Sequence, residues 1–489
     1  MTSETFASDA PSASPVDTSN ASRNRLVINV LLVSTFVVML NETAMTVAIP
    51  KLMQSLNVEA SAAQWLTTAF LLTMAVVIPI TGFLMQRLNS RPVFLLAMSL
   101  FSLGTLIAAV ANGLPVLILG RVVQASGTAI MMPLLMTTVM TLVPPDQRGK
   151  MMGNISIVMS VAPAIGPAAA GLILNYLEWR WLFIIVLPIA LSAMFLGYRM
   201  MLNVTTPRYA PLDILSVILS ALAFGGIVYG LSNFAAPDAP VPGSWALAIG
   251  AVTMVVFIWR QLGLQKKEGA LLDLRPLLEK NFTISMTMIS IVMLAMFGTI
   301  ILLPIYLVQV LHFDTLGTGL LLLPGSLLMG LLGPFVGRLY DKVGPRPLIV
   351  PAMAVVTAVL WAMTLLGTQT WWPLILIGHL FMSVGFAFLF GPLFTASLSS
   401  VKPQFYSHGS ALLGSVQQVA GAAGVAMFVA VMSAQRAGLL AAGQPPLEAL
   451  SGGIRLALTI GASIAILALI ASFFVRKPPA QEGGWGGGH

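Results

Sequence analysis

Glu42 is the acidic residue of this sequence best placed to do chemistry, because it lies in the middle of an apolar run. It occurs in Leu40-Asn-Glu-Thr-Ala-Met-Thr-Val-Ala-Ile-Pro50, whereas the other acidic residues fall in tails, in polar loops or at the ends of such runs. Where an apolar run crosses a membrane, a carboxylate is costly and commonly marks a proton or substrate pathway. We therefore expect Glu42 to load and release a proton. The alternative is a carboxyl group that stays neutral or paired and only joins helices.

Arg121 is a second charged residue inside an apolar run, in Arg121-Val-Val-Gln-Ala-Ser-Gly127. At 1.5 Å per helical residue, Glu42 lies about 12 Å and Arg121 roughly 8 Å from the same end of their runs, so the two side chains can meet or communicate through a water. Arginine keeps its proton in proteins, so its expected role is to bias Glu42 electrostatically. Gln124 lies one turn deeper on the same face. The alternative is an arginine that extends to the nearer membrane surface.

Further polar residues could line a substrate cavity or play a supporting part. The cavity candidates are Asn41, Thr43, Gln124, Asn154, Gln417 and Gln418. Asp213 follows Pro211 at the start of a span, so it is either a helix N-cap or a functional residue. His379 occupies in the second half the place that Arg121 has in the first. It either forms a structural hydrogen bond to another helix or has a functional role. The 28 methionines and 24 phenylalanines also suit an adaptable apolar pocket, although ordinary core and lipid-facing positions account for most of them.

Several kinds of chemistry lack their residues. The sequence has no Gly-x-x-x-x-Gly-Lys-Ser/Thr loop for ATP, no His-Glu-x-x-His metal motif and no cysteine. We therefore expect neither an ATPase of that type nor an intramembrane metalloprotease. A membrane-embedded enzyme would also need a convergent catalytic set, and none is visible. No metal and no cofactor are expected, apart from the proton as coupling ion.

Composition identifies the elements that must position these residues. Of the 489 residues, 57% are hydrophobic and 8% are charged, and apolar runs long enough to cross a bilayer recur along the chain. The runs lack the period of two that marks a transmembrane barrel. We predict an all-α polytopic membrane protein with fourteen spans, at 26–48, 62–84, 92–111, 116–142, 151–174, 181–202, 211–234, 243–261, 283–309, 316–337, 347–367, 372–399, 409–434 and 453–475.

Lysine and arginine are divided unequally between the two ends of these spans. Of the 24, 19 fall on the side of the amino terminus, Arg121 lies inside a span, and the opposite side keeps Lys51, Arg180, Arg436 and Arg455. Basic residues concentrate on the cytoplasmic side, so we expect a multi-pass protein of the cytoplasmic (inner) membrane with both termini in the cytoplasm. The same division argues against a basic patch that would bind nucleic acid.

One short segment occurs twice. Gly82-Phe-Leu-Met-Gln-Arg-Leu-Asn-Ser-Arg-Pro92 recurs without a gap as Gly337-Arg-Leu-Tyr-Asp-Lys-Val-Gly-Pro-Arg-Pro347, at an offset of 255. Internal repeats of this kind build many secondary transporters. The repeated turns could be topology signals only, or Asp341 could pair with a basic group or a helix N-terminus and latch one conformation. The candidate residues of the two turns are Gly82, Arg87, Arg91, Gly337, Asp341, Lys342, Gly344 and Arg346.

The fifth span carries small residues and prolines at 160–171, with Pro163, Gly166, Pro167 and Gly171 as candidate conformational positions. Close helix packing explains the small residues, and a hinge between access states is the alternative. The repeat divides the chain as follows: a disordered tail (1–22), an N-terminal six-helix bundle (23–208), an inserted transmembrane hairpin (209–262), a cytoplasmic linker (263–280), a C-terminal six-helix bundle (281–477) and a second disordered tail (478–489).

Together these segments resemble the major facilitator superfamily, in particular its fourteen-span drug:proton antiporter branch. The repeated turns resemble its inter-span signature, Arg121-x-x-Gln124 its proton-coupling motif, and Gly166-Pro167 with Gly171 its antiporter signature. The first-span segment 40–50 and Trp179-Arg-Trp-Leu-Phe183 also resemble the branch. Within it, Leu-Asn-Glu-Thr and Gln64-Trp-Leu-Thr-Thr-Ala69 look most like lincomycin-resistance-type exporters.

The sequence also departs from the family pattern. The first turn has Gln86 where the family has aspartate and Asn89 where it has glycine. Many relatives place the first-span acid at the position of Asn41, so Glu42 is turned by ~100° around the helix. Ala125 stands where the fourth-span motif usually has glycine.

The resemblance implies a secondary transporter rather than an enzyme, which exports hydrophobic or amphipathic drugs in exchange for protons by alternating access. A dedicated exporter of a lipid or other metabolite is the alternative within the same fold, and a membrane receptor or scaffold is the alternative outside transport. The expected partners are small hydrophobic substrates, protons and membrane lipids, without nucleic acid. We expect a monomer, with a periplasmic adaptor as a further partner where the host has an outer membrane.

Overall fold

The computed structural model describes residues 18–201, 203, 212–234 and 241–477, and within these residues it contains helices and no strands. Fourteen of the helices are long and apolar enough to cross a membrane, so the predicted all-α fold with fourteen spans is confirmed. The predicted disordered tails lie largely outside the described residues. Residues 18–22 are an exception, since they already form the first turns of helix α1.

The helices run slightly beyond the predicted spans at most ends. Their bounds are α1 (Thr18–Leu56), α2 (Ala60–Arg87), α3 (Ser90–Ala109), α4 (Leu114–Leu142), α5 (Arg148–Tyr176), α6 (Trp181–Met200), α7 (Ile214–Ser232), α8 (Gly243–Leu264), α9 (Lys280–Gln309), α10 (Thr315–Val343), α11 (Arg346–Met363), α12 (Trp372–Ser399), α13 (Tyr406–Ala441) and α14 (Pro446–Ser472). Odd-numbered helices begin at the end of the bundle that carries most lysines and arginines, which we call the basic end. The other end is called the far end.

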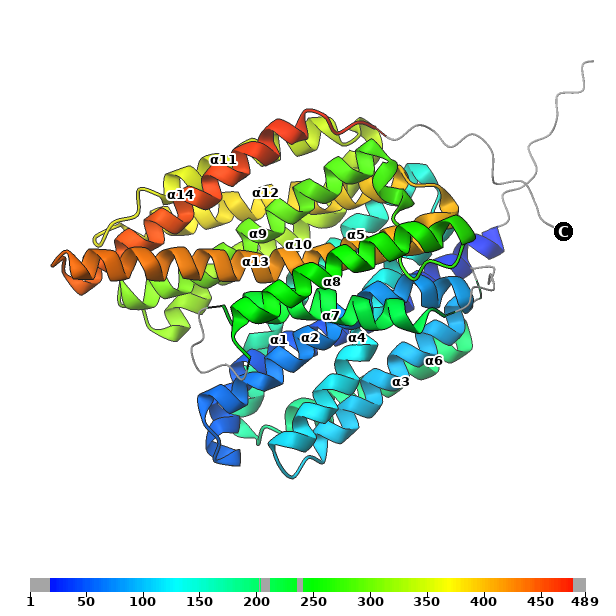
Figure 1. The fold of residues 1–489 in the computed structure, drawn as a ribbon, viewed down its shortest axis with the longest axis horizontal. Helices are drawn as coiled ribbons and strands as arrows, with labels where there is room; N and C mark the ends of the chain where they lie inside the picture. Colours follow the sequence, from blue (N-terminus) through cyan, green and yellow to red (C-terminus); the bar gives the residue numbers. More distant parts are fainter. Residues whose placement is uncertain (1–17, 202, 204–211, 235–240, 478–489) are drawn as a thin grey trace, which may run out of the picture.

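Helices α1, α2, α3, α4 and α6 lie in the lower part of Figure 1, and α5 packs on α1 on one side and on α10 on the other. Helices α3 and α4 touch backbone to backbone, because glycines leave no side chain between them. A Cβ atom added at Gly104 would lie 2.3 Å from the Gln124 nitrogen, and one at Gly127 would lie 2.3 Å from the Ala97 oxygen. Small residues are the usual means of close helix packing in membranes. This contact fixes α4, the helix that carries Arg121.

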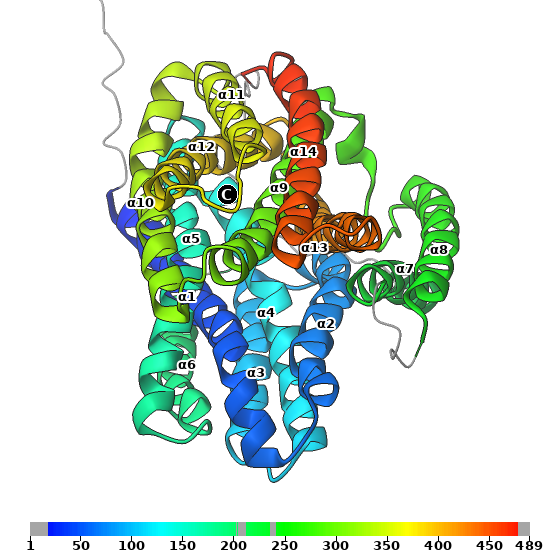
Figure 2. The same ribbon diagram turned by 90° about the vertical axis from the view of Figure 1, so that its left-hand side faces the viewer.

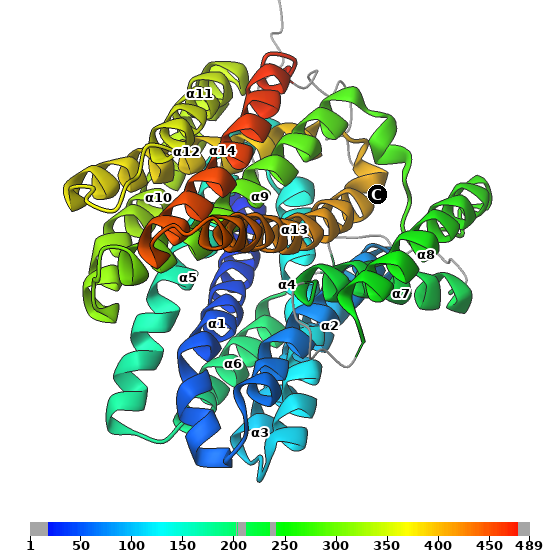
Figure 3. The same ribbon diagram turned by 60° about the vertical axis from the view of Figure 1, so that its left-hand side comes forward.

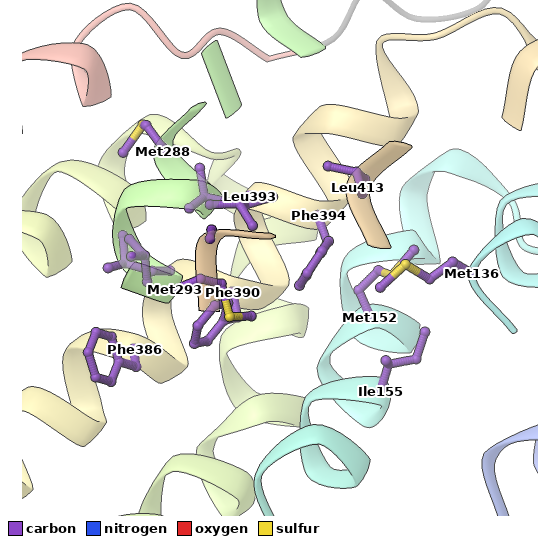
Figure 4. Close-up of a cluster of buried hydrophobic side chains, with 14 of the residues drawn as sticks. Met136, Met152, Ile155, Met288, Met293, Phe386, Phe390, Leu393, Phe394 and Leu413 are labelled. Carbon is purple, nitrogen blue, oxygen red and sulfur yellow. The ribbon is translucent and has the colours of Figure 1, made fainter. Parts of the chain in front are cut away.

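Helices α9 to α14 form the upper part of the same view, with α13 packed on α9 and α14, and α12 packed on α10 and α11. Figure 2, which looks at the far end, shows two seams between the parts. Helix α5 meets α10 along one seam and α2 meets α13 along the other. Buried methionine, phenylalanine and leucine side chains from α4, α5, α9, α12 and α13 form one cluster that crosses between the parts (Figure 4).

Helices α7 and α8 pair with each other, and α7 lies against α2 and α13, outside the other twelve (Figure 3). Gly226 and Gly250 allow this pairing, since a Cβ at Gly226 would lie 2.9 Å from the Gly250 Cα. The linker predicted at 263–280 begins inside the end of α8 and ends at the start of α9, and between these helices it forms two short 3-10 turns at 265–267 and 275–278. Residues 269–273, between those turns, are buried, so this part of the linker is docked onto the helices.

Candidate functional site

Arg121 lies buried among polar side chains, with 1% of its surface exposed. Its Nη1 atom donates to the Gln124 Oε1 atom at 2.6 Å and lies 3.3 Å from the Asn41 Oδ1 atom. The Gln124 amide in turn donates to the Thr105 hydroxyl at 2.8 Å. A chain of hydrogen bonds therefore joins α1, α4 and α3. Buried polar networks of this type hold a unique side-chain arrangement when their members are satisfied.

The guanidinium of Arg121 is only partly satisfied by these bonds. Its Nε atom is buried without a hydrogen-bond partner, and its Cζ atom lies 4.0 Å from the centre of the Phe70 ring. A desolvated cation on an aromatic face gains about 2 kcal/mol. The immediate partners of Arg121 are thus neutral dipoles and a ring. A buried positive charge so placed is stabilised by any carboxylate that comes near.

Glu42 lies close enough to Arg121 for their charges to interact, and its side chain is half-buried. The two residues form no salt bridge among the described residues. The direct α1 partner of Arg121 is Asn41, because neighbouring residues on a helix point about 100° apart. Glu42 and Arg121 therefore interact electrostatically at a distance, without forming a salt bridge.

The predicted fifth-span motif packs against the predicted first-span motif. A Cβ at Gly166 would lie 2.1 Å from the Thr43 hydroxyl oxygen and 2.9 Å from the Leu40 carbonyl oxygen, so only glycine fits there. The Thr43 hydroxyl approaches the Ala162 carbonyl of α5 at 3.5 Å. Gly171 has no atom within 4 Å of such a Cβ. Gly166 thus brings α5 against the helix turn that carries Asn41 and Glu42.

Pro163 and Pro167 lie inside α5, which continues as a helix from Arg148 to Tyr176. Their rings interrupt the backbone hydrogen bonds of the turn on either side of Gly166. The segment between them, with Gly166, packs against Leu40 and Thr43 of α1, and Ala162 and Leu174 on either side also contact α1. The structure therefore places this part of the motif at the α1–α5 contact.

The remaining predicted cavity residues divide into two that belong to the Arg121 network and three that lie apart from it. Asn41 and Gln124 are buried inside the network, so neither lines an open cavity in this conformation. Asn154 is half-buried on α5 and contacts the Met151 sulfur at 3.7 Å. Gln417 and Gln418 are half-buried on α13, and the Gln417 Nε2 atom is buried without a hydrogen-bond partner.

His379 joins two helices of the C-terminal part. Its Nε2 atom lies 3.1 Å from the Leu322 carbonyl oxygen of α10, and its Nδ1 atom is buried without a partner. A Cβ at Gly325 would lie 2.5 Å from the His379 ring, so α10 and α12 are in close contact there. The position that matches Arg121 in the second half therefore holds a helix–helix hydrogen bond.

Asp341 spans the seam between α10 and α5 at the basic end. Its carboxylate accepts hydrogen bonds from the backbone nitrogens of Gly149 at 2.7 Å and Lys150 at 2.8 Å. These are free amides at the start of α5, where a negative charge is favourable. Gly337 makes the approach possible, since a Cβ there would lie 2.1 Å from the Gly149 oxygen. The acid of the second turn thus meets a helix N-terminus, one of the two partners considered for it.

The remaining residues of the two turns differ in what they contact. Gly344 has φ +80°, which ends α10 in a conformation that side chains rarely adopt. Lys342 and Arg346 are exposed. Arg91 donates to the Tyr198 carbonyl at 2.7 Å and lies over the Tyr198 ring, so it joins α3 to α6. In the first copy, Gly82 faces α13, and Arg87 is exposed at the end of α2.

Sequence reasoning missed the position of Arg148, which was counted only as a topology signal. Arg148 is 5% exposed and donates to the Met140 carbonyl at 2.9 Å and the Val143 carbonyl at 3.2 Å. Its guanidinium lies over the Tyr406 ring of α13 at 5.6 Å. Arg148 therefore closes the end of α4 and touches the opposite part of the molecule. Its place directly before a span was the signal available, since helix ends leave free carbonyls.

Asp213 caps α7 by accepting from the Ser216 nitrogen at 3.2 Å. It also accepts two hydrogen bonds from Arg260 of α8, at 2.7 and 2.8 Å. This guanidinium holds the pKa of Asp213 down at about 2. The residue therefore does more than cap a helix, because it ties the two helices of the hairpin together. No group of three or more histidine or acidic side chains that could hold a metal occurs within the described ranges.

These features define a class of protein, a helical membrane protein with two packed groups of spans and an arginine buried inside the first group. Residues 31–425 match the Major Facilitator Superfamily, and the chain belongs to that family. The family consists of transporters, so the prediction of a transporter rather than an enzyme is confirmed. With its fourteen apolar helices, the chain is a multi-pass membrane protein.

Two relatives and one solved structure illustrate the similarity. The chain is 36% identical to an uncharacterized MFS-type transporter of Bacillus subtilis, YcnB, over 94% of this chain and 96% of that protein. It is 36% identical to the lincomycin resistance protein LmrB of Listeria monocytogenes, over 92% and 96%. The crystal structure of the human organic anion transporter MFSD10 superposes with a TM-score of 0.64 at 16% identity, covering 92% of this chain and 99% of that one, which shows a shared fold.

Proposed function

We propose that this transporter exports hydrophobic or amphipathic drugs in exchange for protons, across the cytoplasmic membrane and with its basic end in the cytoplasm. The observation that carries the proposal is Glu42, a half-buried acid inside a span beside a buried arginine whose direct partners are neutral. Relatives of nearly full length include a protein named for lincomycin resistance, which supports a drug as substrate.

The chemistry follows from the charge of Arg121. When Glu42 is ionised, its carboxylate balances the buried guanidinium; when Glu42 takes up a proton, that charge is left to dipoles and the Phe70 ring. The two protonation states therefore favour different arrangements of α1 and α4. A proton that binds one conformation better than the other drives the exchange between them, and the same holds for the drug.

The conformation described here is closed at the basic end. Asp341 meets α5 there, Thr137 of α4 donates to Ser410 of α13 at 3.1 Å, and Arg148 lies over Tyr406. In our proposal the two six-helix groups rock about the site, and these contacts break when the transporter opens to the cytoplasm. The proton then enters from the far end and leaves to the cytoplasm as the halves rock.

The test is transport by purified protein in liposomes with an imposed pH gradient, using a fluorescent dye or a lincosamide as cargo. The parent should accumulate or expel cargo according to the gradient, and Glu42→Gln should lose that dependence. Glu448→Gln, an exposed acid at the far end, is the matched control and should behave as the parent. Full gradient-driven transport by Glu42→Gln would contradict the coupling assignment.

A dedicated exporter of a lipid or metabolite would show the same coupling but no drug transport in this assay. A receptor or scaffold would move no cargo and would be indifferent to neutralising Glu42. The adaptor protein and the monomeric state remain predictions, which co-purification from native membranes would address.

A further inference from the structure

The docked segment between α8 and α9 is buried in a way that its sequence does not suggest. Ala270, Leu271, Leu272 and Asp273 are 5%, 1%, 1% and 3% exposed, although they follow two lysines and a glutamate. A buried segment without regular structure must find partners for its backbone groups. We call residues 269–275 the clasp.

One side of the clasp is held by the inserted hairpin. The side-chain oxygen of Gln261, on α8, accepts from the backbone nitrogens of Leu271 at 2.9 Å and Leu272 at 3.3 Å. The Gln261 amide then donates to the Ser216 hydroxyl of α7 at 2.7 Å. Gln261 is fully buried. The clasp is therefore fastened to both helices of the hairpin through one side chain.

The other side of the clasp is held by the start of α13. The Asp273 nitrogen donates to the Nδ1 atom of His408 at 3.2 Å, and His408 is 1% exposed. The Asp273 carboxylate pairs with Arg275, whose guanidinium lies 4.6 Å from the centre of the Phe405 ring. This ion pair raises the pKa of Arg275 further and keeps the guanidinium against the ring.

His408 also touches the opposite part of the molecule. A Cβ at Gly82 of α2 would lie 2.9 Å from the His408 Nδ1 atom and 3.3 Å from the Ala411 Cβ. Gly82 opens the first of the two repeated turns, the copy that has Gln86 in place of the acid. The clasp, α13 and α2 therefore meet at one point, where the two parts must separate if the basic end opens.

The internal repeat shows that the α2–α13 seam lacks a contact that the α5–α10 seam has. The 3-10 turn Pro145–Gln147 before α5 corresponds to Pro403–Phe405 before α13, at an offset of 258. The same offset matches Lys150 with His408. Lys150 donates its backbone nitrogen to Asp341, the acid of the second turn. The first turn has no acid to offer α13, and at the matching position the clasp is bound to His408 instead.

We propose that the clasp and the α7–α8 hairpin lock α2 to α13 at the basic end and so set how readily that end opens. Opening the seam would take His408 away from Asp273 or pull Leu271 and Leu272 into water, and either event is unfavourable. The inserted hairpin then has a mechanical part in the transport cycle. This inference rests on the alternating access of the proposed function.

The test measures opening directly and uses the absence of cysteine from the chain. Ser410→Cys places one thiol, isosteric with the serine, in the buried contact between α13 and α4. An impermeant maleimide is applied to the basic face of inside-out vesicles. Leu271→Ser and Gln261→Ala should each raise the labelling rate at least tenfold. Leu278→Ser, in the same segment but 79% exposed, should leave the rate within twofold of the parent.

A second reporter separates opening from misfolding. Ala462→Cys lies in α14 at 0% exposure and should stay unlabelled in every folded variant. If it becomes labelled in Leu271→Ser, that variant is unfolded and Gln261→Ala decides the matter. Rates within twofold of the parent for the folded variants would overturn the clasp. The assay needs neither cargo nor gradient, so a failure of drug transport alone would refute the proposed function and leave this result standing.

Discussion

Removing the Asp341 carboxylate should loosen the α5–α10 seam by an amount that the structure allows us to work out. The carboxylate accepts two backbone hydrogen bonds, at 2.7 and 2.8 Å, from the start of α5. A hydrogen bond to a charged group contributes about 1.5–3 kcal/mol when buried, and water replaces part of this because Asp341 is half-exposed. We expect a net loss of about 1.5–2 kcal/mol for Asp341→Ala, of which the helix dipole contributes a few tenths or more.

A loss of this size shifts the equilibrium toward an open basic end about 10- to 30-fold, since 1.4 kcal/mol is a factor of ten. Asp341→Asn keeps one acceptor oxygen and loses the charge, so its effect should be a few-fold only. The assay is maleimide labelling of Ser156→Cys from the basic face. Ser156 is 4% exposed and lies 3.0 Å from the position of a Cβ at Gly333 on α10. Its labelling rate follows the population of the open state when opening is fast.

The matched control is Asp146→Ala, which removes an exposed acid just before α5. It changes the net charge of the same surface by the same amount, and it should leave the labelling rate within twofold of the parent. Equal acceleration by both variants would show that surface charge, and not the two hydrogen bonds, holds the seam. No acceleration by Asp341→Ala would refute the latch itself.

Three further outcomes follow from the geometry. Gly166→Val should lower the melting temperature in detergent, by an overpacking penalty of about 1–3 kcal/mol, whereas Gly171→Ala should not lower it, because no atom is near. The Asp213–Arg260 pair has a folded pKa of about 2 at the aspartate, below the unfolded value, so its stabilisation is present above pH ~4 and is lost as pH falls toward 2. The melting-temperature difference between the parent and Asp213→Asn should therefore vanish over that range, and a constant difference would refute the pairing. Arg121→Lys should abolish gradient-driven transport with the protein still folded, because an ammonium cannot reproduce the planar stacking and forked donors of a guanidinium; parental transport would contradict this.

Much of the architecture was predictable because the membrane imposes it. A bilayer demands long apolar helices, so the fourteen spans follow from the runs of hydrophobic residues. The pairing of Arg121 with Gln124 was also accessible, since residues three apart share a helix face. The same rule does not give the rotation of one helix against another. For that reason the sequence could not show that Asn41, and not Glu42, is in direct contact with Arg121.

The docking of the clasp was hidden for a different reason. Leu271 and Leu272 lie in a short segment rich in charged residues, and two leucines there are not enough to predict that the segment is buried. Gln261, the partner of Leu271, is 10 residues away in the chain, and His408, the partner of Asp273, is 135 residues away, so tertiary packing alone brings them together. The division of the chain into two bundles, a hairpin and a linker stays a prediction, and the labelling experiments above bear on it.

The central claim is that Glu42 carries the exchanged proton, and proton movement driven by cargo tests it most directly. Liposomes holding purified protein and a lumenal pH dye receive a cargo gradient at equal internal and external pH. The parent should move protons against the cargo, whereas Glu42→Gln should let cargo run down its gradient with the lumenal pH unchanged. Proton movement by Glu42→Gln in step with cargo would contradict the account.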